Sequence, residues 1–245
     1  MTAVRVFADP QVLAEAAARH VAQSAQAAID ARGRFSLTLS GGSTPRDLHL
    51  RLAGPPLADQ IDWSRVHIFF GDEGCVPPDD ERSNFRMAED TLLSKVPIPT
   101  AHIHRMRGEL PPEQAASDYA RQLKELFDDA PPRLDLVLLG MGDNGHTASL
   151  FPGLTAVHER RAQVVAEYVD EVGMWRITLT PVVLNLAREV VFLVAGAAKA
   201  SMLHQVLEGP YAPDERPAQI VQPVPGELIW MVDAAAAAEL SPPPG

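Results

Sequence analysis

The 245 residues of this chain carry a formal net charge of −11, 46% of them are hydrophobic, and Cys75 is the one cysteine. The length fits one large α/β domain or two small ones with a sizeable core. The acidic balance argues against nucleic acid or an anionic membrane as partner, because either needs a basic surface. One cysteine excludes an internal disulfide, and the lack of a signal-peptide pattern or a bilayer-length apolar run predicts a cytoplasmic protein.

Apolar runs alternate with helical patterns along the chain. Asp9 and Pro10 predict the start of a helix that Gly33 ends, and Pro111-Pro112 opens another. The alanines at 234–238 predict a terminal helix, followed by a frayed tail at 242–244. We therefore expect a single domain spanning residues 1–245, in a Rossmann-like α/β fold with a mostly parallel sheet and helices on both faces. The expected strands are Val4–Ala8, Phe35–Leu39, Val66–Phe70, Leu134–Leu139, Val164–Val169, Arg176–Thr180, Val190–Val194 and Leu228–Val232.

Ligands of such sheets bind beyond the carboxyl ends of the strands, so the residues that follow the strands form the candidate site. After the strand at 35–39 comes Ser40-Gly41-Gly42-Ser43-Thr44, and Pro45 then suits the first position of a helix. The glycines and hydroxyls form a candidate anion cradle of backbone amides and side-chain donors. The Gly-Lys-Ser/Thr ending of a Walker loop is absent, and an ordinary capped turn is the alternative.

Two adjacent carboxylates, Asp72 and Glu73, follow the strand at 66–70. A strand end in such a sheet suits carboxylates that serve a site, whereas ordinary solvated acids are the alternative. Cys75 lies nearby and is a candidate nucleophile with His146, although a lone cysteine is more often inert.

His146 follows the apolar run at 134–139 and a glycine-rich loop. We expect it at the start of a short helix that Pro152 closes, where the helix N-terminus keeps the imidazole neutral. A neutral imidazole suits a general base, and backbone amides near Gly142 and Gly145 are candidate oxyanion donors.

The same loop supports two other interpretations. Gly140, Gly142 and Gly145 spell the G-x-G-x-x-G pattern of a dinucleotide site, with Glu167 further along. Against this, a helix cut off at Pro152 is too short for the usual crossover. The plainer alternative is a tight strand-to-helix turn with an incidental histidine.

Two cations follow later strands. Period-2 alternation places Arg176, Thr178 and Thr180 on one face of a strand, and Thr180-Pro181 then begins a helix. Lys199 lies in the first turn of the helix after the strand at 190–194, where the dipole disfavours a cation unless an anion is bound. Solvated side chains are the alternative for both.

Four segments share one family's pattern: Leu39–Pro45, Gly71–Glu73 with Ser83-Asn84, Gly145–Pro152 and Gly196–Ala200. Together they resemble the 6-phosphogluconolactonase family over nearly the whole chain. The resemblance implies the fold shared with glucosamine-6-phosphate deaminases and ribose-5-phosphate isomerases. It also implies hydrolysis of 6-phospho-D-glucono-1,5-lactone to 6-phospho-D-gluconate in the oxidative pentose phosphate pathway, without a metal or another cofactor.

In that reaction we expect His146 to activate the water and Asp72 to position the water or the sugar hydroxyls. The phosphate is expected to bind the cradle, Arg176 and Lys199. The complete set of expected substrate ligands is Ser40, Gly41, Gly42, Ser43, Thr44, Asn84, Arg86, Gly142, Gly145, Arg176 and Lys199.

Two positions depart from the family pattern. Gly74 stands where the family usually has arginine after Asp-Glu, and Arg82 or Arg86 is the candidate substitute. Asn144 stands where the family usually has aspartate before Gly-His. If that aspartate orients the histidine, Asn144 weakens the base unless Asp143 takes over.

Two other functions remain as alternatives. A deaminase or isomerase needs a carboxylate a few residues after the Gly-His pair, and Thr147–Pro152 contains none. A non-catalytic sugar-phosphate-binding module is usually fused to a DNA-binding domain, for which there is no room before Val4. The expected partner is thus a small phosphorylated sugar lactone. The sequence leaves the oligomeric state open, with a monomer as the expectation.

Overall fold

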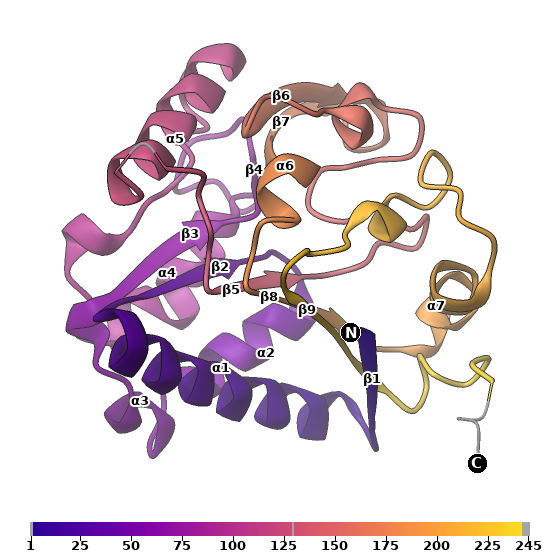
Figure 1. Ribbon diagram of the computed structural model, residues 1–245, viewed down its shortest axis with the longest axis horizontal. Helices are drawn as coiled ribbons and strands as arrows, with labels where there is room; N and C mark the ends of the chain where they lie inside the picture. Colours follow the sequence, from indigo (N-terminus) through magenta and orange to yellow (C-terminus); the bar gives the residue numbers. More distant parts are fainter. Residues whose placement is uncertain (1, 129, 242–245) are drawn as a thin grey trace.

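The computed structural model describes residues 2–128 and 130–241, which form two β-sheets (Figure 1). The main sheet is parallel, in the order β1-β9-β8-β5-β2-β3. Its strands are β1 (Thr2–Phe7), β2 (Phe35–Leu39), β3 (Val66–Phe70), β5 (Leu136–Leu139), β8 (Glu189–Val194) and β9 (Glu227–Asp233). The small sheet is antiparallel, in the order β4-β7-β6, with strands β4 (Asp72–Gly74), β7 (Met174–Leu179) and β6 (Val164–Val169).

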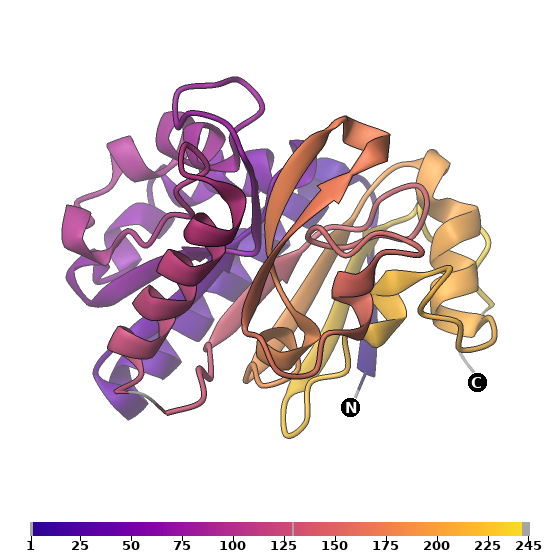
Figure 2. The same cartoon turned by 90° about the horizontal axis from the view of Figure 1, so that it is seen from above.

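Helices cover both faces of the main sheet, as Figures 1 and 2 show. Buried side chains of α1, α2 and α4 pack on one face. Those of α5, α6, α7 and the small sheet pack on the other. No helix within the described residues is long and apolar enough to cross a membrane. The helices are α1 (Pro10–Arg32), α2 (Ser43–Leu52), α3 (Leu57–Gln60), α4 (Asn84–Thr91), α5 (Pro112–Leu126), α6 (Pro181–Leu184) and α7 (Ala200–Glu208). The 3-10 turns are Trp63–Arg65, Leu93–Lys95, Thr100–His102, Thr155–His158, Asp170–Val172, Ala197–Lys199 and Pro217–Ile220.

The first helix begins and ends where the sequence predicts. The Asp9 carboxylate accepts hydrogen bonds from the backbone N–H groups of Gln11 and Val12, so it satisfies two of the free donors of the first turn. Gly33 ends the helix in the left-handed conformation, with φ of 76°. The sequence prediction of a largely parallel α/β fold is confirmed. That β6 and β7 leave the main sheet was not predicted.

Two predicted local structures are wrong. Residues 234–238 form consecutive turns instead of a helix, because a five-alanine run is too short to propagate one and the Asp233 side chain binds the N–H of Ala236. Helix α2 begins at Ser43 with Gly42 as its N-cap, so Pro45 occupies the third position of the helix and not the first. The predicted tail at 242–244 lies outside the described residues.

Burial of His49 in α2 makes stability depend on pH. Its Nδ1 lies 3.1 Å from the hydroxyl of Thr91, and its Nε2 has no partner within the described residues. Burial lowers the pKa of His49 to about 4, whereas the unfolded chain keeps the ordinary value of 6.5. Between these values the unfolded state binds more protons, so stability falls as the pH falls.

We expect His49 to remove about 2 kcal/mol from the free energy of unfolding between pH 7 and pH 5. The variant His49→Leu should lose that much less over the same interval, as measured by urea unfolding at both pH values. Other buried histidines contribute equally to both proteins, so the difference isolates His49. Equal losses in the two proteins would contradict this assignment.

Candidate active site

A cavity of about 380 Å³ lies at the carboxyl ends of four neighbouring strands, β8, β5, β2 and β3. Each of these strands leads into one of the loops that the sequence marked as chemically important, and the small sheet supplies a further wall. We call it the strand-end cavity. Its lining is Ser40, Gly41, Gly42, Asp72, Asn84, Gly140, Met141, Gly142, His146, Ala148, Phe151, Val172, Arg176 and Lys199.

Four of the predicted substrate ligands do not line this cavity. Ser43 and Thr44 follow the cavity-lining glycines in the chain and are the first two residues of α2. The Arg86 guanidinium donates to the carbonyl of Asp79 at 2.8 Å and is half exposed, because α4 directs it away from the site. Gly145 lies behind the loop, where its Cα faces the Met202 sulfur and Arg216. Arg82 binds the Asp80 carboxylate, so neither arginine proposed to compensate for Gly74 reaches the cavity.

His146 lies against two neighbours that fix its ring. The imidazole stacks on Phe151 with 4.0 Å between ring centroids. A Cβ atom at Gly142 would lie 2.1 Å from the ring, so only glycine leaves room for the imidazole there. Burial lowers the pKa of His146 below its ordinary value of 6.5, although the Asp72 carboxylate opposes this. The side chain is therefore neutral at neutral pH, as a general base must be.

The short helix predicted after His146 does not form. The chain makes a tight turn, in which the N–H of Leu150 donates to the carbonyl of Thr147 at 2.9 Å and Ala148 has a φ of +46°. A positive φ at a non-glycine residue is incompatible with a helix, so burial and not a helix dipole keeps His146 neutral. The chain then enters the small antiparallel sheet through β6, so the βαβ crossover of a dinucleotide site is also absent from the described residues.

The two amides expected to form an oxyanion site already have partners. The N–H of Gly142 donates to the carbonyl of His146 at 2.8 Å, and the N–H of Gly145 donates to the carbonyl of Gly142 at 3.1 Å. These bonds close the loop on itself. They hold the imidazole in place and leave neither amide free for a substrate oxygen.

Asn144 orients the imidazole. Its Oδ1 lies 2.7 Å from Nδ1 of His146 and also accepts from the backbone N–H of His146 at 3.1 Å. Asp143 does not take over this role, because its carboxylate lies 2.5 Å from the Nζ of Lys199. Asparagine at this position therefore keeps a contact to the base, with an amide oxygen in place of a carboxylate.

Asp72 lies in a buried network of polar side chains. Its carboxylate accepts from the Ser149 hydroxyl at 2.6 Å and from the Asn84 amide at 3.1 Å, and it pairs with the Arg176 guanidinium. Arg176 also donates from Nε to Ser149 at 2.8 Å. Ser149 was not predicted from the sequence, because its contact to Asp72 spans 77 positions. The network holds Asp72 rigidly at the wall of the cavity.

Glu73 is also buried, but it binds the start of α4 and does not line the cavity. Its carboxylate accepts from the backbone N–H groups of Gly74, Asn84 and Phe85, each at 2.8 Å, and from the Ser83 hydroxyl at 3.0 Å. Burial raises its pKa, while these hydrogen bonds act in the opposite direction. Glu73 thus caps α4 and fixes Asn84 against Asp72. Since both acids are buried, the alternative of two solvated carboxylates is wrong.

Donors for an anion also line the cavity. The first N–H groups of α2 have no partners within the helix, and Gly41 and Gly42 before them line the cavity. The Ser40 hydroxyl is buried and has no hydrogen-bond partner within the described residues. Lys199, in the turn before α7, reaches the same space, where it pairs with the exposed carboxylate of Asp143.

Cys75 is not an activated nucleophile. Burial raises the pKa of its thiol to about 11, so the thiolate is scarce at neutral pH. The thiol also does not line the strand-end cavity.

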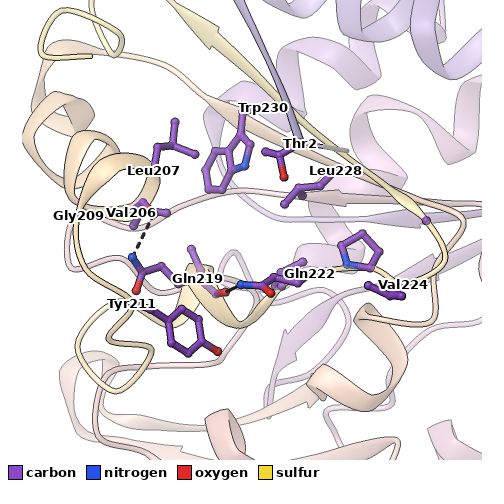
Figure 3. A pocket seen from close by; sticks show the side chains of 14 residues that line it. Thr2, Val206, Leu207, Gly209, Tyr211, Gln219, Gln222, Val224, Leu228 and Trp230 are labelled. Carbon is purple, nitrogen blue, oxygen red and sulfur yellow. Dashed lines mark hydrogen bonds between the residues drawn. The ribbon is translucent and has the colours of Figure 1, made fainter. Parts of the chain in front are cut away.

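A second cavity, of about 520 Å³, lies at the amino ends of β1 and β9. Figure 3 shows Trp230 and Tyr211 on opposite sides of it. Within the described part of the chain its lining contains no carboxylate, imidazole or ammonium group. Of these two cavities, only the strand-end cavity is lined by a carboxylate, an imidazole and an ammonium group.

Comparisons with known proteins agree with the fold described above. Residues 8–230 match the family model described as glucosamine-6-phosphate isomerases/6-phosphogluconolactonase. A 6-phosphogluconolactonase from Nostoc sp. is 41% identical over 243 residues, which cover 97% of this chain and 98% of the relative. The structure of 6-phosphogluconolactonase from Trypanosoma brucei superposes with a TM-score of 0.87 at 30% identity, covering 98% of this chain and 99% of that one.

A monomeric glucosamine-6-phosphate deaminase also superposes, with a TM-score of 0.80 over 97% of this chain and 99% of that chain. At 22% identity this likeness concerns the fold alone. Both the family model and the Nostoc relative cover nearly the whole chain. The chain therefore belongs to the glucosamine-6-phosphate isomerase/6-phosphogluconolactonase family.

Proposed function

We propose that this protein hydrolyses 6-phospho-D-glucono-1,5-lactone in the strand-end cavity, as a step of the oxidative pentose phosphate pathway. The observation that carries the proposal is a neutral, oriented His146 in one cavity with Asp72 and Lys199. The relatives that match along the full chain are named 6-phosphogluconolactonases, which supports it. We further propose a cytoplasmic, monomeric protein that acts without an added metal.

In the proposed reaction, His146 is the general base. Its Nδ1 faces the acceptor Oδ1 of Asn144, so Nδ1 carries the proton and Nε2 is free to take one from water. The water oxygen bonds to the lactone carbonyl carbon, and the bond from that carbon to the ring oxygen then breaks. The protonated histidine returns its proton to the ring oxygen, and 6-phosphogluconate leaves. Asp72, held by Arg176 and Ser149, positions the water or the sugar hydroxyls.

The phosphate anchors the substrate at the opposite end. Lys199 supplies a point charge, and the loop before α2 supplies the amides of the helix N-terminus and the Ser40 hydroxyl. Arg176 uses Nε and one terminal nitrogen for Ser149 and Asp72, which leaves its other terminal nitrogen for substrate. Binding energy from the unreactive phosphate holds the lactone carbonyl near His146, which lowers the barrier through positioning.

To test the proposal, the same purified protein is assayed separately with the lactone and with glucosamine 6-phosphate. We expect rapid loss of freshly generated 6-phosphogluconolactone and no ammonia release from glucosamine 6-phosphate. The turn at 147–152 has no acid, and Asp72 is the one carboxylate in the lining of the strand-end cavity within the described chain. Ammonia release would favour the deaminase alternative. Tight binding of both compounds without turnover would favour a non-catalytic sugar-phosphate-binding module.

Lys199→Ala is expected to lower kcat/KM for the phosphorylated lactone by roughly ten- to a hundredfold, because a hydrogen bond to a charged group contributes about 1.5–3 kcal/mol. Activity on unphosphorylated gluconolactone should change little. Steady-state kinetics on both lactones checks this.

The matched control for Lys199 is Lys95→Ala, which removes the same charge from an exposed position outside the cavity. That variant should behave as the parent protein does on both substrates. Equal losses on both lactones in Lys199→Ala, or none on either, would remove Lys199 from the phosphate site.

A further inference from the structure

The side chain that orients His146 is itself held by a carboxylate from another part of the chain. The Asn144 amide donates from Nδ2 to Oε2 of Glu171 at 2.6 Å, while its Oδ1 lies 2.7 Å from Nδ1 of His146. Glu171 belongs to the 3-10 turn Asp170–Val172, at the tip of the hairpin that joins β6 to β7. The next residue, Val172, lines the strand-end cavity. The hairpin tip thus contacts both the cavity and the side chain that orients the base.

The chemistry of these three groups allows one arrangement of protons. An ionised carboxylate only accepts hydrogen bonds, so the amide nitrogen of Asn144 must face Glu171. The amide oxygen then faces the imidazole, where it requires a proton on Nδ1 of His146. This leaves Nε2 unprotonated, the form that a general base needs.

We propose that Glu171 is a positioning residue that selects the reactive tautomer of His146 through Asn144. The kinetic consequence rests on the proposed lactone hydrolysis, whereas the tautomer can be measured without substrate. Two hydrogen bonds hold the Asn144 amide in this orientation, the one to Glu171 and the one from the backbone N–H of His146 to Oδ1. If Glu171 is neutralised, only the second still distinguishes the two ends of the amide, and in part of the molecules the amide turns by 180° and presents its nitrogen to the ring. His146 then carries its proton on Nε2 and cannot accept one from water.

The pair also accounts for asparagine at position 144. An aspartate there would place two carboxylates in contact across the 2.6 Å that now separates an amide nitrogen from an oxygen. In this protein the carboxylate of Glu171 therefore does not contact the imidazole directly. It fixes the orientation of the Asn144 amide, and the amide oxygen fixes the position of the proton on His146.

The test uses Glu171→Gln, Asn144→Asp and the double variant. Glu171→Gln should lower kcat roughly tenfold with KM nearly unchanged, because a glutamine amide can face Asn144 either way round. Asn144→Asp alone should also lose activity through the contact with Glu171. The double variant should regain most of kcat, because the glutamine amide then donates to the carboxylate introduced at position 144, which accepts directly from His146. Asp170→Asn is the matched control, since it neutralises the neighbouring exposed acid in the same turn.

Nitrogen-15 NMR of the His146 ring supplies a readout that does not depend on turnover. In the parent protein we expect the proton on Nδ1 and an unprotonated Nε2, and in Glu171→Gln a mixture of both tautomers. Glu171→Gln with parental kcat and an unchanged tautomer would overturn the proposal, as would a double variant less active than either single one. If the parent protein fails to hydrolyse the lactone, the proposed function is wrong, and the NMR tautomer alone decides the role of Glu171.

Discussion

Replacing His146 by alanine is expected to lower kcat by a factor on the order of 10²–10⁴, the usual contribution of a general base. The substitution removes the group that takes the proton from water but leaves Lys199 and the loop before α2 unchanged. Binding of the product, 6-phosphogluconate, should therefore persist with a Kd within a few-fold of the parent value. Steady-state hydrolysis corrected for the spontaneous rate and titration calorimetry with the product measure the two quantities.

The matched control for this variant is His158→Ala, because His158 is an exposed histidine outside the strand-end cavity. It should retain parental kcat. The thermal midpoint of each variant checks that the fold is intact. Near-parental kcat in His146→Ala would show that another group activates the water, with Asp72 as the leading candidate.

Asp72→Ala is expected to lower the free energy of unfolding by about 3–5 kcal/mol, because removing one partner of a buried ion pair strands the other charge. The side chains of Asp72 and Arg176 are only 7% and 15% exposed. The change also removes an acceptor from the Ser149 hydroxyl and the Asn84 amide. Urea unfolding at neutral pH measures the loss.

A second substitution separates two causes of the loss in stability, the unpaired charge of Arg176 and the loss of packing at position 72. The double variant Asp72→Ala with Arg176→Met should be more stable than Asp72→Ala alone, since it no longer buries an unpaired guanidinium. Asp72→Asn tests the role in catalysis, because it keeps the shape and loses the charge. A cost below about 1 kcal/mol for Asp72→Ala would mean that water reaches the pair and screens it.

Sequence patterns located the strands well because short runs dominated by apolar residues predict strands, both largely buried ones such as β2 and β3 and a partly exposed one such as β6. The bounds predicted for β2, β3 and β6 are those observed. The sequence did not predict which strands pair. The apolar run at 164–169 and the period-2 alternation at 176–180 predict that β6 and β7 are strands, but they do not predict that these strands pair with each other and with the three-residue strand β4. That pairing depends on contacts distant in sequence.

The same limit explains which site residues were found. Residues directly after parallel strands, such as Asp72, His146 and Lys199, could be predicted, because topology brings the carboxyl ends of strands together. Ser149 and Glu171 could not, since their partners Asp72 and Asn144 lie 77 and 27 positions away. The local reading of His146 as a helix start was wrong for a related reason. Burial of the imidazole, not a helix dipole, lowers its pKa.

The hydrolysis rate of freshly generated 6-phosphogluconolactone in the presence of EDTA is the measurement that tests the central claim most directly. Proton release should be followed at several substrate concentrations, with the spontaneous hydrolysis subtracted. We expect a saturable rate well above the spontaneous one, undiminished by the chelator. A rate equal to the spontaneous hydrolysis, with or without EDTA, would contradict the assignment of the strand-end cavity as a lactonase active site.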